Sequence, residues 1–226
     1  MQRSSEKEIT KVSKEENNRD NIKEKIIETA LKQFLSRGIK EVKMDDIASL
    51  ISVSKRTIYE LFTDKEVLII ETLKHHQKQM HDEARKIIKS STDILDVILQ
   101  LYGLYFKNLK NTSRRFFADL DRYPNVRKGL KEREKKNDKR FIAWMEEGRK
   151  QGLFRKDADF KILAFVFKRD MELIMTINKQ ATDGELSNYT PDQLGRLLIL
   201  CYLRGIATAK GQEKIEIFIQ KTNNKI

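Results

Sequence analysis

The chain has 226 residues, of which 35% are charged and 39% are hydrophobic, a composition typical of a soluble protein with one ordinary core or two smaller ones. Its apolar runs at 162–167 and 197–203 are far too short to cross a membrane. Its only cysteine, Cys201, excludes an internal disulfide. The first residues contain no apolar segment, so we expect no signal peptide and a cytoplasmic protein. Only nine glycines and two prolines interrupt the chain, so we expect long helices.

The net charge of +12 is compatible with a nucleic-acid partner, but its distribution does not locate a binding site. Residues 1–20 have no net charge, residues 21–66 carry +1, and the remaining +11 lies downstream. Residues 107–140 alone hold 13 basic and 5 acidic side chains. We expect the basic stretch 127–140 to form a solvated helix face. The alternative is that it attracts an acidic ligand or a DNA backbone.

Residues 1–20 alternate in charge and have almost no apolar content, which predicts a disordered tail. The alternative is that its basic side chains follow a phosphate backbone. From Asp20 onward, apolar residues at helical spacing predict a helix that ends at Gly38. The residues expected on its inner face are Ile22, Ile26, Ala30 and Phe34.

Two short helices are predicted next, at about 44–50 and 54–62, joined by a tight turn. Acidic residues in the first turn of the former are favoured there by the helix dipole. A capping box formed by Thr63 and Glu66 then predicts the start of a long helix.

The rest of the chain indicates further helices, without strand-like alternation or repeats. Thr190, Pro191 and Gln193 form the capping pattern of the last long helix. Cys201 falls in that apolar helix, so we expect it to be a buried small side chain. The predicted helices lie at about 93–109, from near 113, at 125–150, 158–180, 191–209 and 212–221.

A longer helix followed by two short helices and a tight turn is a helix-turn-helix arrangement, whose second helix normally lies in the DNA major groove. Ile58, Leu61 and Phe62 share one face of that helix, so we expect them to pack inward. The other face carries groups that donate to guanine or phosphate or contact a thymine methyl. The residues that we expect to contact DNA on this basis are Ser54, Lys55, Arg56, Thr57, Tyr59 and Lys65.

Residues 22–73 resemble the DNA-binding domain of the TetR family of bacterial transcriptional regulators (TetR/AcrR-type). The matching stretches are ALKQFLSRGI (30–39), MDDIA (44–48), VSKRTIYELF (53–62) and DKEVL (64–68). Shorter stretches that resemble the family's second domain are EEGRKQGLF (146–154) and LRGIAT (203–208).

The resemblance implies an all-α fold with an N-terminal three-helix helix-turn-helix DNA-binding domain and a C-terminal helical ligand-binding and dimerisation domain. We therefore divide the chain into the tail (1–20), the DNA-binding domain (21–67, with the motif at about 43–62) and the second domain (68–226). The family forms homodimers through its last two long helices, here those near 158–180 and 191–209. Its DNA-contact positions correspond to Lys43, Ser54, Lys55, Arg56, Thr57, Tyr59 and Lys65.

Three positions depart from the family pattern. The family usually has threonine at the position of Lys43, so this chain keeps a phosphate-binding group there but loses a helix cap. The family often has glycine at the position of Ser52, where serine is strained if φ is positive. A small residue is common at the position of Arg56, so the operator preference of relatives cannot be transferred.

We expect no metal site, no cofactor and no enzymatic activity. His75, His76 and His81 lack the helical spacing of metal ligands, and the chain has no Gly-rich phosphate loop or nucleophile–base framework. Six large side chains at helical spacing are candidates for a ligand pocket, with core packing as the alternative: Tyr105, Phe116, Phe117, Trp144, Phe165 and Met171.

Together these features predict a ligand-responsive transcriptional regulator without a membrane partner. We expect a repressor that binds a palindromic DNA operator as a homodimer and leaves it when a small-molecule effector enters the second domain. Its location would be the cytoplasm, in association with the nucleoid. The alternative is an effector-free or partner-controlled architectural DNA-binding protein of the same fold.

Overall fold

The computed structural model describes residues 2–179 and 189–223, which form ten helices and one isolated bridge. The predicted all-α fold is confirmed over these residues. One helix was predicted at 158–180, and its last residue, 180, lies outside the described residues. Two compact units are present, Met1–Gln79 and Met80–Ile226, so their boundary falls inside one helix, α4 (Lys65–Ser90). The boundary predicted at 67/68, between the DNA-binding domain and the second domain, stays a prediction. No helix of the described residues has the length and apolar character needed to cross a membrane.

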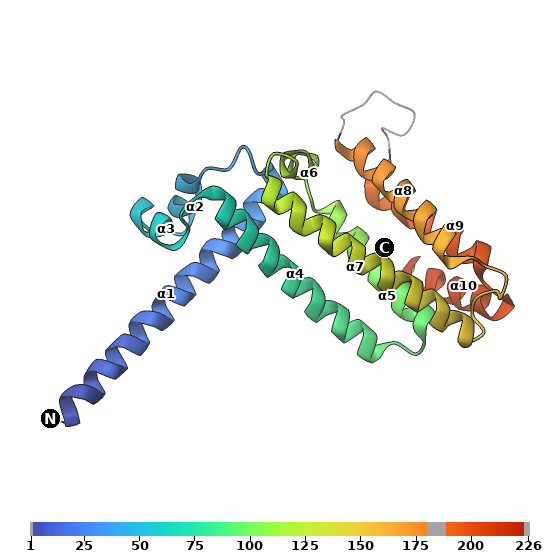
Figure 1. Cartoon of the computed structure of the whole chain (residues 1–226), viewed down its shortest axis with the longest axis horizontal. Helices are drawn as coiled ribbons and strands as arrows, with labels where there is room; N and C mark the ends of the chain where they lie inside the picture. Colours follow the sequence, from blue (N-terminus) through green and yellow to red (C-terminus); the bar gives the residue numbers. More distant parts are fainter. Residues whose placement is uncertain (1, 180–188, 224–226) are drawn as a thin grey trace. The chain divides into compact units, whose positions relative to one another are not determined.

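The first unit begins with α1 (Gln2–Arg37), which Figure 1 draws as one uninterrupted helix. The prediction of a disordered tail over 1–20 is therefore wrong for residues 2–20. This stretch contains no glycine or proline and is rich in lysine and glutamate, which are strong helix formers. The helix ends as predicted at Gly38, which has a φ of 89° and donates from its backbone N–H to Phe34 O at 3.0 Å.

The first unit has its own apolar core, built from α1, α2 (Met44–Leu50), α3 (Lys55–Leu61) and the start of α4. α2 packs against both α1 and α3. Burying such side chains stabilises the fold by roughly 1.5–3 kcal/mol each, so this core holds the two short helices in place. Its fully buried members include Ile26, Phe34, Ile39, Ile47, Ile58, Phe62 and Leu68.

The turn between α2 and α3 passes through Ser52 with a φ of 57°. The φ at this position is positive, so the strain expected for serine under that condition is present. Two backbone bonds close the turn: Ser52 N donates to Ser49 O at 3.2 Å, and Val53 N donates to Ala48 O at 3.0 Å.

The start of α4 differs from the predicted capping box. The helix begins at Lys65, and the side chain of Asp64, rather than that of Thr63, accepts from the N–H of Val67 at 2.9 Å. An aspartate is an equally good N-cap, and it moves the start of the helix by one residue. The sequence contains both capping solutions, and the structure uses that of Asp64.

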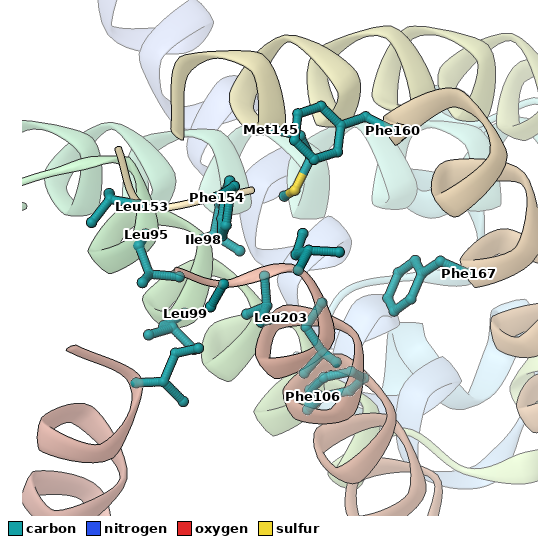
Figure 2. Close-up of a cluster of buried hydrophobic side chains, with 14 of the residues drawn as sticks. Leu95, Ile98, Leu99, Phe106, Met145, Leu153, Phe154, Phe160, Phe167 and Leu203 are labelled. Carbon is teal, nitrogen blue, oxygen red and sulfur yellow. The ribbon is translucent and has the colours of Figure 1, made fainter. Parts of the chain in front are cut away.

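The second unit contains the rest of α4 and six further helices. α5 packs against α9, α7 and α10, and α8 packs against α6, α7 and α9. Figure 2 shows its core, where Leu203 of α9 lies beside Phe106 of α5. The six helices are α5 (Ile94–Lys110), α6 (Arg114–Leu120), α7 (Pro124–Lys150), α8 (Phe160–Lys179), α9 (Pro191–Ile206) and α10 (Ala209–Asn223).

Two close contacts hold this unit together. α9 approaches α5 so closely at Gly195 that a Cβ there would collide with the ring of Phe106. The α7–α8 and α9–α10 linkers pair as a short antiparallel bridge between Phe154 and Ala207. Arg155 N donates to Ile206 O at 2.8 Å, and Thr208 N donates to Leu153 O at 3.0 Å.

The N-terminus of α9 follows the predicted pattern, since Gln193 accepts from the backbone N–H of Thr190 at 2.8 Å. The prediction for Cys201 is wrong, because its side chain is exposed. In α9 it shares a face with exposed Leu197, four residues earlier, whereas Ile199 and Leu203 face the core.

Candidate nucleic-acid interface

The N-terminus of α3 is fixed by a hydroxyl cap. Ser54 has extended backbone geometry, and its Oγ accepts from the N–H of Thr57 at 3.0 Å. The hydroxyl oxygens of Ser54 and Thr57 lie 2.8 Å apart, so one donates to the other. Both predicted contact residues therefore have a structural role in the free protein, and each keeps lone pairs or a proton for a further partner.

α3 has two distinct faces. Ile58 is fully buried and Phe62, its C-cap, is 1% exposed, which fixes the helix on the first unit. Ser54, Lys55, Arg56 and Tyr59 are exposed, with 44% of Tyr59 open to solvent. The predicted split between a packing face and a free face is thus present, and the free face carries a hydroxyl, two cations and a phenol.

Lys55 is held by an acid from the preceding helix. Its Nζ lies 2.6 Å from Oδ2 of Asp45, in the first turn of α2. The hydrogen bond and the negative charge of Asp45 raise the pKa of Lys55. This ion pair links α2 to α3 across the turn and leaves two of the three ammonium protons for another acceptor.

Arg56 is held by an acid of its own helix. Its Nε donates to Oε1 of Glu60 at 2.7 Å, one helical turn away. The hydrogen bond and the charge of Glu60 raise the pKa of Arg56. Its side chain is 88% exposed, which makes it the most open of the cations in these pairs.

The other two predicted contact residues stand at helix N-termini. Lys43 is the N-cap of α2 and makes no side-chain cap; instead Asp46 accepts from the Lys43 N–H at 3.1 Å. The expected loss of the cap at Lys43 is confirmed, and Asp46 supplies the reciprocal bond. Lys65 is the first residue of α4 and donates from Nζ to Lys40 O at 3.5 Å.

Two acids of this surface were not predicted as site residues: Asp45 and Glu60. The i, i+4 spacing of Arg56 and Glu60 is a signal that could have identified the second pair. The pair between Lys55 and Asp45 depends on how the turn folds, so spacing alone does not reveal it.

The six ligand-pocket candidates are only partly brought together. Phe117, Trp144 and Met171 are half-buried and pack against the core of the second unit, and the rings of Phe116 and Phe117 lie 5.4 Å apart. Tyr105 and Phe165 are 44% and 62% exposed. A pocket lined by all six therefore stays a prediction.

Apolar side chains are exposed along α8 and α9, the two helices predicted to dimerise. Phe165 of α8 and Leu197 of α9 are 62% and 63% exposed, and three further apolar side chains of α8 are between 40% and 61% exposed. Exposed apolar side chains gathered on one surface are typical of protein–protein contact sites. The other members are Ile162, Val166 and Leu173.

No metal-ligand group is found among the residues that the structure describes. His75, one of the three histidines in question, lies with its Nε2 3.0 Å from the side-chain nitrogen of Gln79. The exposed face of α3 and its surroundings carries cations, hydroxyls and one phenol on a buried framework, which suits binding to a polyanion.

Known proteins share this architecture. The chain is 24% identical over 200 residues to the HTH-type transcriptional repressor KstR2 of Mycolicibacterium smegmatis, which covers 84% of this chain and 93% of the relative. A 65-residue segment is 45% identical to the HTH-type transcriptional regulator YhgD of Bacillus subtilis and covers 27% of this chain and 34% of that protein. A transcriptional regulator from Saccharomonospora viridis, solved in complex with choline, matches with a TM-score of 0.69 and 20% identity over 84% of this chain and 99% of that one.

The family model that matches is the one described as bacterial regulatory proteins, tetR family, and it covers residues 26–72. This range contains α2, α3 and their buried framework, the part of the chain in which the cations, hydroxyls and phenol are presented. Residues 26–72 therefore form a domain of the TetR family of bacterial transcriptional regulators.

Proposed function

We propose that the chain is a ligand-responsive repressor that binds a palindromic operator as a homodimer. The observation that carries the proposal is the two-faced α3, with Ile58 fully buried beneath exposed Lys55, Arg56 and Tyr59. A helix so fixed can enter the major groove without rearranging its own core. The remaining predicted contacts, Lys43, Ser54, Thr57 and Lys65, would position the helix on phosphates.

The proposed dimer forms through α8 and α9. Their exposed apolar side chains, Phe165 and Leu197 among them, would be covered by the same helices of a second copy in a two-fold symmetric contact. Two copies of α3 would then read two half-sites one or more helical turns apart, about 34–36 Å for one turn. Such a complex would reside in the cytoplasm, at the nucleoid.

The proposed effector site lies in the second domain, with Phe117, Trp144 and Met171 as its candidate lining. The Saccharomonospora viridis relative was solved with choline, which supports a small-molecule site in this fold. A ligand that binds one conformation more tightly shifts the population toward it, and the repressor leaves its operator if that conformation places the two α3 helices at another spacing.

The test begins with recovery of the DNA that the protein binds in its genome, followed by titration of a recovered operator. Lys55→Ala and Tyr59→Phe should each weaken operator binding, since each removes a donor from the free face of α3. Lys86→Ala is a matched control, because Lys86 is exposed on α4 and paired with Glu83. If both α3 variants bind like the wild type, the contact face is assigned wrongly.

A thermal-shift screen against metabolites tests the effector. A ligand that binds the folded protein raises its Tm, and a true effector should also lower operator affinity. A protein that no metabolite stabilises, yet which binds its operator, would correspond to the effector-free or partner-controlled alternative.

A further inference from the structure

We infer that Glu60 is a positioning residue for DNA recognition: it holds the guanidinium of Arg56 so that the two terminal amino groups stay available to a base. The inference rests on the proposed DNA-binding function and adds to it a residue of opposite charge. Glu60, although acidic, would thus help the protein to select its DNA sequence.

The geometry of the pair leaves one edge of the guanidinium free. Arg56 uses its Nε to donate to Oε1 of Glu60 at 2.7 Å. Within the described part of the chain, no acceptor is bound to its terminal amino groups. Both side chains are open to solvent, at 88% and 55%, and both belong to the helix whose opposite face buries Ile58. The free edge is thus presented on the side away from the core.

That free edge matches a base. A guanine presents two acceptors, O6 and N7, in the major groove, and an arginine binds them with two parallel N–H groups. A guanidinium has five N–H groups, of which Glu60 occupies only the one on Nε. An arginine that is already held loses less side-chain freedom when it binds. Glu60 therefore strengthens the contact that Arg56 makes with its correct base.

The charge of Glu60 also increases specificity, because it weakens binding to DNA of other sequences. Its carboxylate stands on the face that phosphates would approach, and like charges repel. Non-specific binding depends on phosphate contacts alone, so it gains no base contact to offset this repulsion. Glu60 thus raises specific affinity and lowers non-specific affinity, and both effects increase the ratio between them.

A purely structural role gives a different expectation. Exposed pairs at i, i+4 stabilise helices slightly, so loss of Glu60 would lower stability. Loss of one negative charge would then strengthen binding to every DNA alike and leave the specificity ratio unchanged. The ratio therefore separates positioning from helix stabilisation.

The experiment measures that ratio. The wild-type protein first selects its preferred duplex from a randomised pool, and affinities are then measured for this duplex and for a scrambled one of equal length and composition. Glu60→Ala should lower the ratio about threefold or more, as expected when one ordered side chain is released. The loss should vanish in an Arg56→Ala background, since no guanidinium then remains to be positioned.

Further variants sharpen the result. Glu60→Gln keeps the size of the side chain and an oxygen acceptor for Nε. Its ratio of specific to non-specific affinity should therefore lie between those of Glu60→Ala and the wild type. A second selection with Glu60→Ala should relax the same base positions that Arg56→Ala relaxes. Glu83→Ala is the matched control, because it removes one acid from an exposed pair on α4, and its ratio should equal that of the wild type.

Three results would overturn the inference: an unchanged ratio in Glu60→Ala, an equal loss in the Arg56→Ala background, or relaxation at other base positions. Its failure differs from that of the proposed function. If the wild type selects a sequence and Glu60 has no effect, only the inference fails. If the wild type selects no sequence, the proposed function fails and the inference fails with it.

Discussion

Lys55 donates from Nζ to Oδ2 of Asp45 at 2.6 Å, so an acid of α2 holds the first basic residue of α3. Both side chains remain largely open to solvent, at 67% and 50%, and a phosphate or a base can therefore replace Asp45. The hydrogen bond and the negative charge of Asp45 raise the pKa of Lys55, so the ammonium is charged in this ion pair. In the proposed complex, Asp45 and DNA would therefore compete for the ammonium group of Lys55.

Asp45→Asn removes the competing charge and should strengthen DNA binding about two- to fivefold, the range of an exposed ion pair. The gain should be absent in a Lys55→Ala background. Fluorescence anisotropy titrations with a labelled operator at several salt concentrations provide the measurement. Asp82→Asn changes the charge equally in an exposed pair of α4 and should have little effect. A gain that persists without Lys55 would show that the competition does not involve this cation.

Ser52→Gly should stabilise the first unit. Ser52 adopts a φ of 57°, where a side chain costs energy and glycine does not. After allowance for the greater freedom of glycine in the unfolded chain, we expect a gain of about 0.5–1 kcal/mol in the free energy of unfolding, measured with urea. Ser49→Gly, inside α2, should instead lose about 0.3–0.5 kcal/mol. If Ser52→Gly lowered the free energy of unfolding, as Ser49→Gly should, the backbone at Ser52 would not be strained.

Gly195→Ala should destabilise the second unit, because its Cβ would collide with the ring of Phe106. Overpacking of this kind costs about 1–3 kcal/mol. Gly103→Ala, in α5, is the matched control, since nothing lies within 4 Å of its added Cβ. That variant should gain up to about 1 kcal/mol from helix propensity. Chemical denaturation of both variants tests the contact, and equal effects would show that α5 and α9 do not approach so closely.

Tyr202 on α9 donates to Oδ2 of Asp170 on α8 at 2.6 Å. Burial, then the hydrogen bond and the charge of Asp170, raise the pKa of Tyr202 to about 12. A raised folded-state pKa means that this stabilisation is complete below the unfolded value, about 10. It is lost as the pH rises from about 10 through about 12.

Tyr202→Phe should therefore lower stability at neutral pH by about 0.5–1.5 kcal/mol, with a smaller deficit at alkaline pH. Ultraviolet titration should show one phenol fewer ionising near pH 12. Tyr189→Phe, which alters an exposed side chain, serves as the control. An equal deficit at neutral and alkaline pH would argue against this hydrogen bond.

Leu197→Glu and Phe165→Glu should each weaken or abolish the proposed dimer. These side chains are 63% and 62% exposed in the single chain, and their burial between two copies would contribute about 1.5–3 kcal/mol each. A charge in that contact would also be desolvated. Light scattering after size-exclusion chromatography should show monomers. Ile88→Glu alters a side chain that is 50% exposed on α4 and should leave the dimer intact.

Much of the architecture follows from local patterns. Helical spacing of Ile26, Ala30 and Phe34 predicts the inner face of α1, and Ile58 and Phe62 predict that of α3; all five are buried. Positive φ at Gly38 and Ser52 also follows from residue type and family pattern. These signals depend on neighbours along the chain, which a sequence shows directly.

Other features depend on contacts between distant residues or on a balance of weak terms. The ion pair of Lys55 and Asp45 crosses a turn, and the exposure of Cys201 follows from the rotation of α9 about its axis. For residues 2–20, low apolar content argued for disorder, whereas helix propensity prevailed. The choice of Asp64 over Thr63 as cap is a competition between two nearly equal solutions.

The bridge between Phe154 and Ala207 has a consequence for the order in which the chain folds. It joins two linkers that are separated along the chain by the whole of α8 and α9, so it can form only once the intervening segment has closed into a loop. Non-local contacts of this kind slow folding, because the entropy of loop closure is lost before the contact forms. The first unit has no such bridge among its described residues, and α2 and α3 follow one another within a few residues. We therefore expect α2 and α3, the helix pair proposed to read DNA, to fold quickly, and the second unit to set the rate at which the complete chain folds.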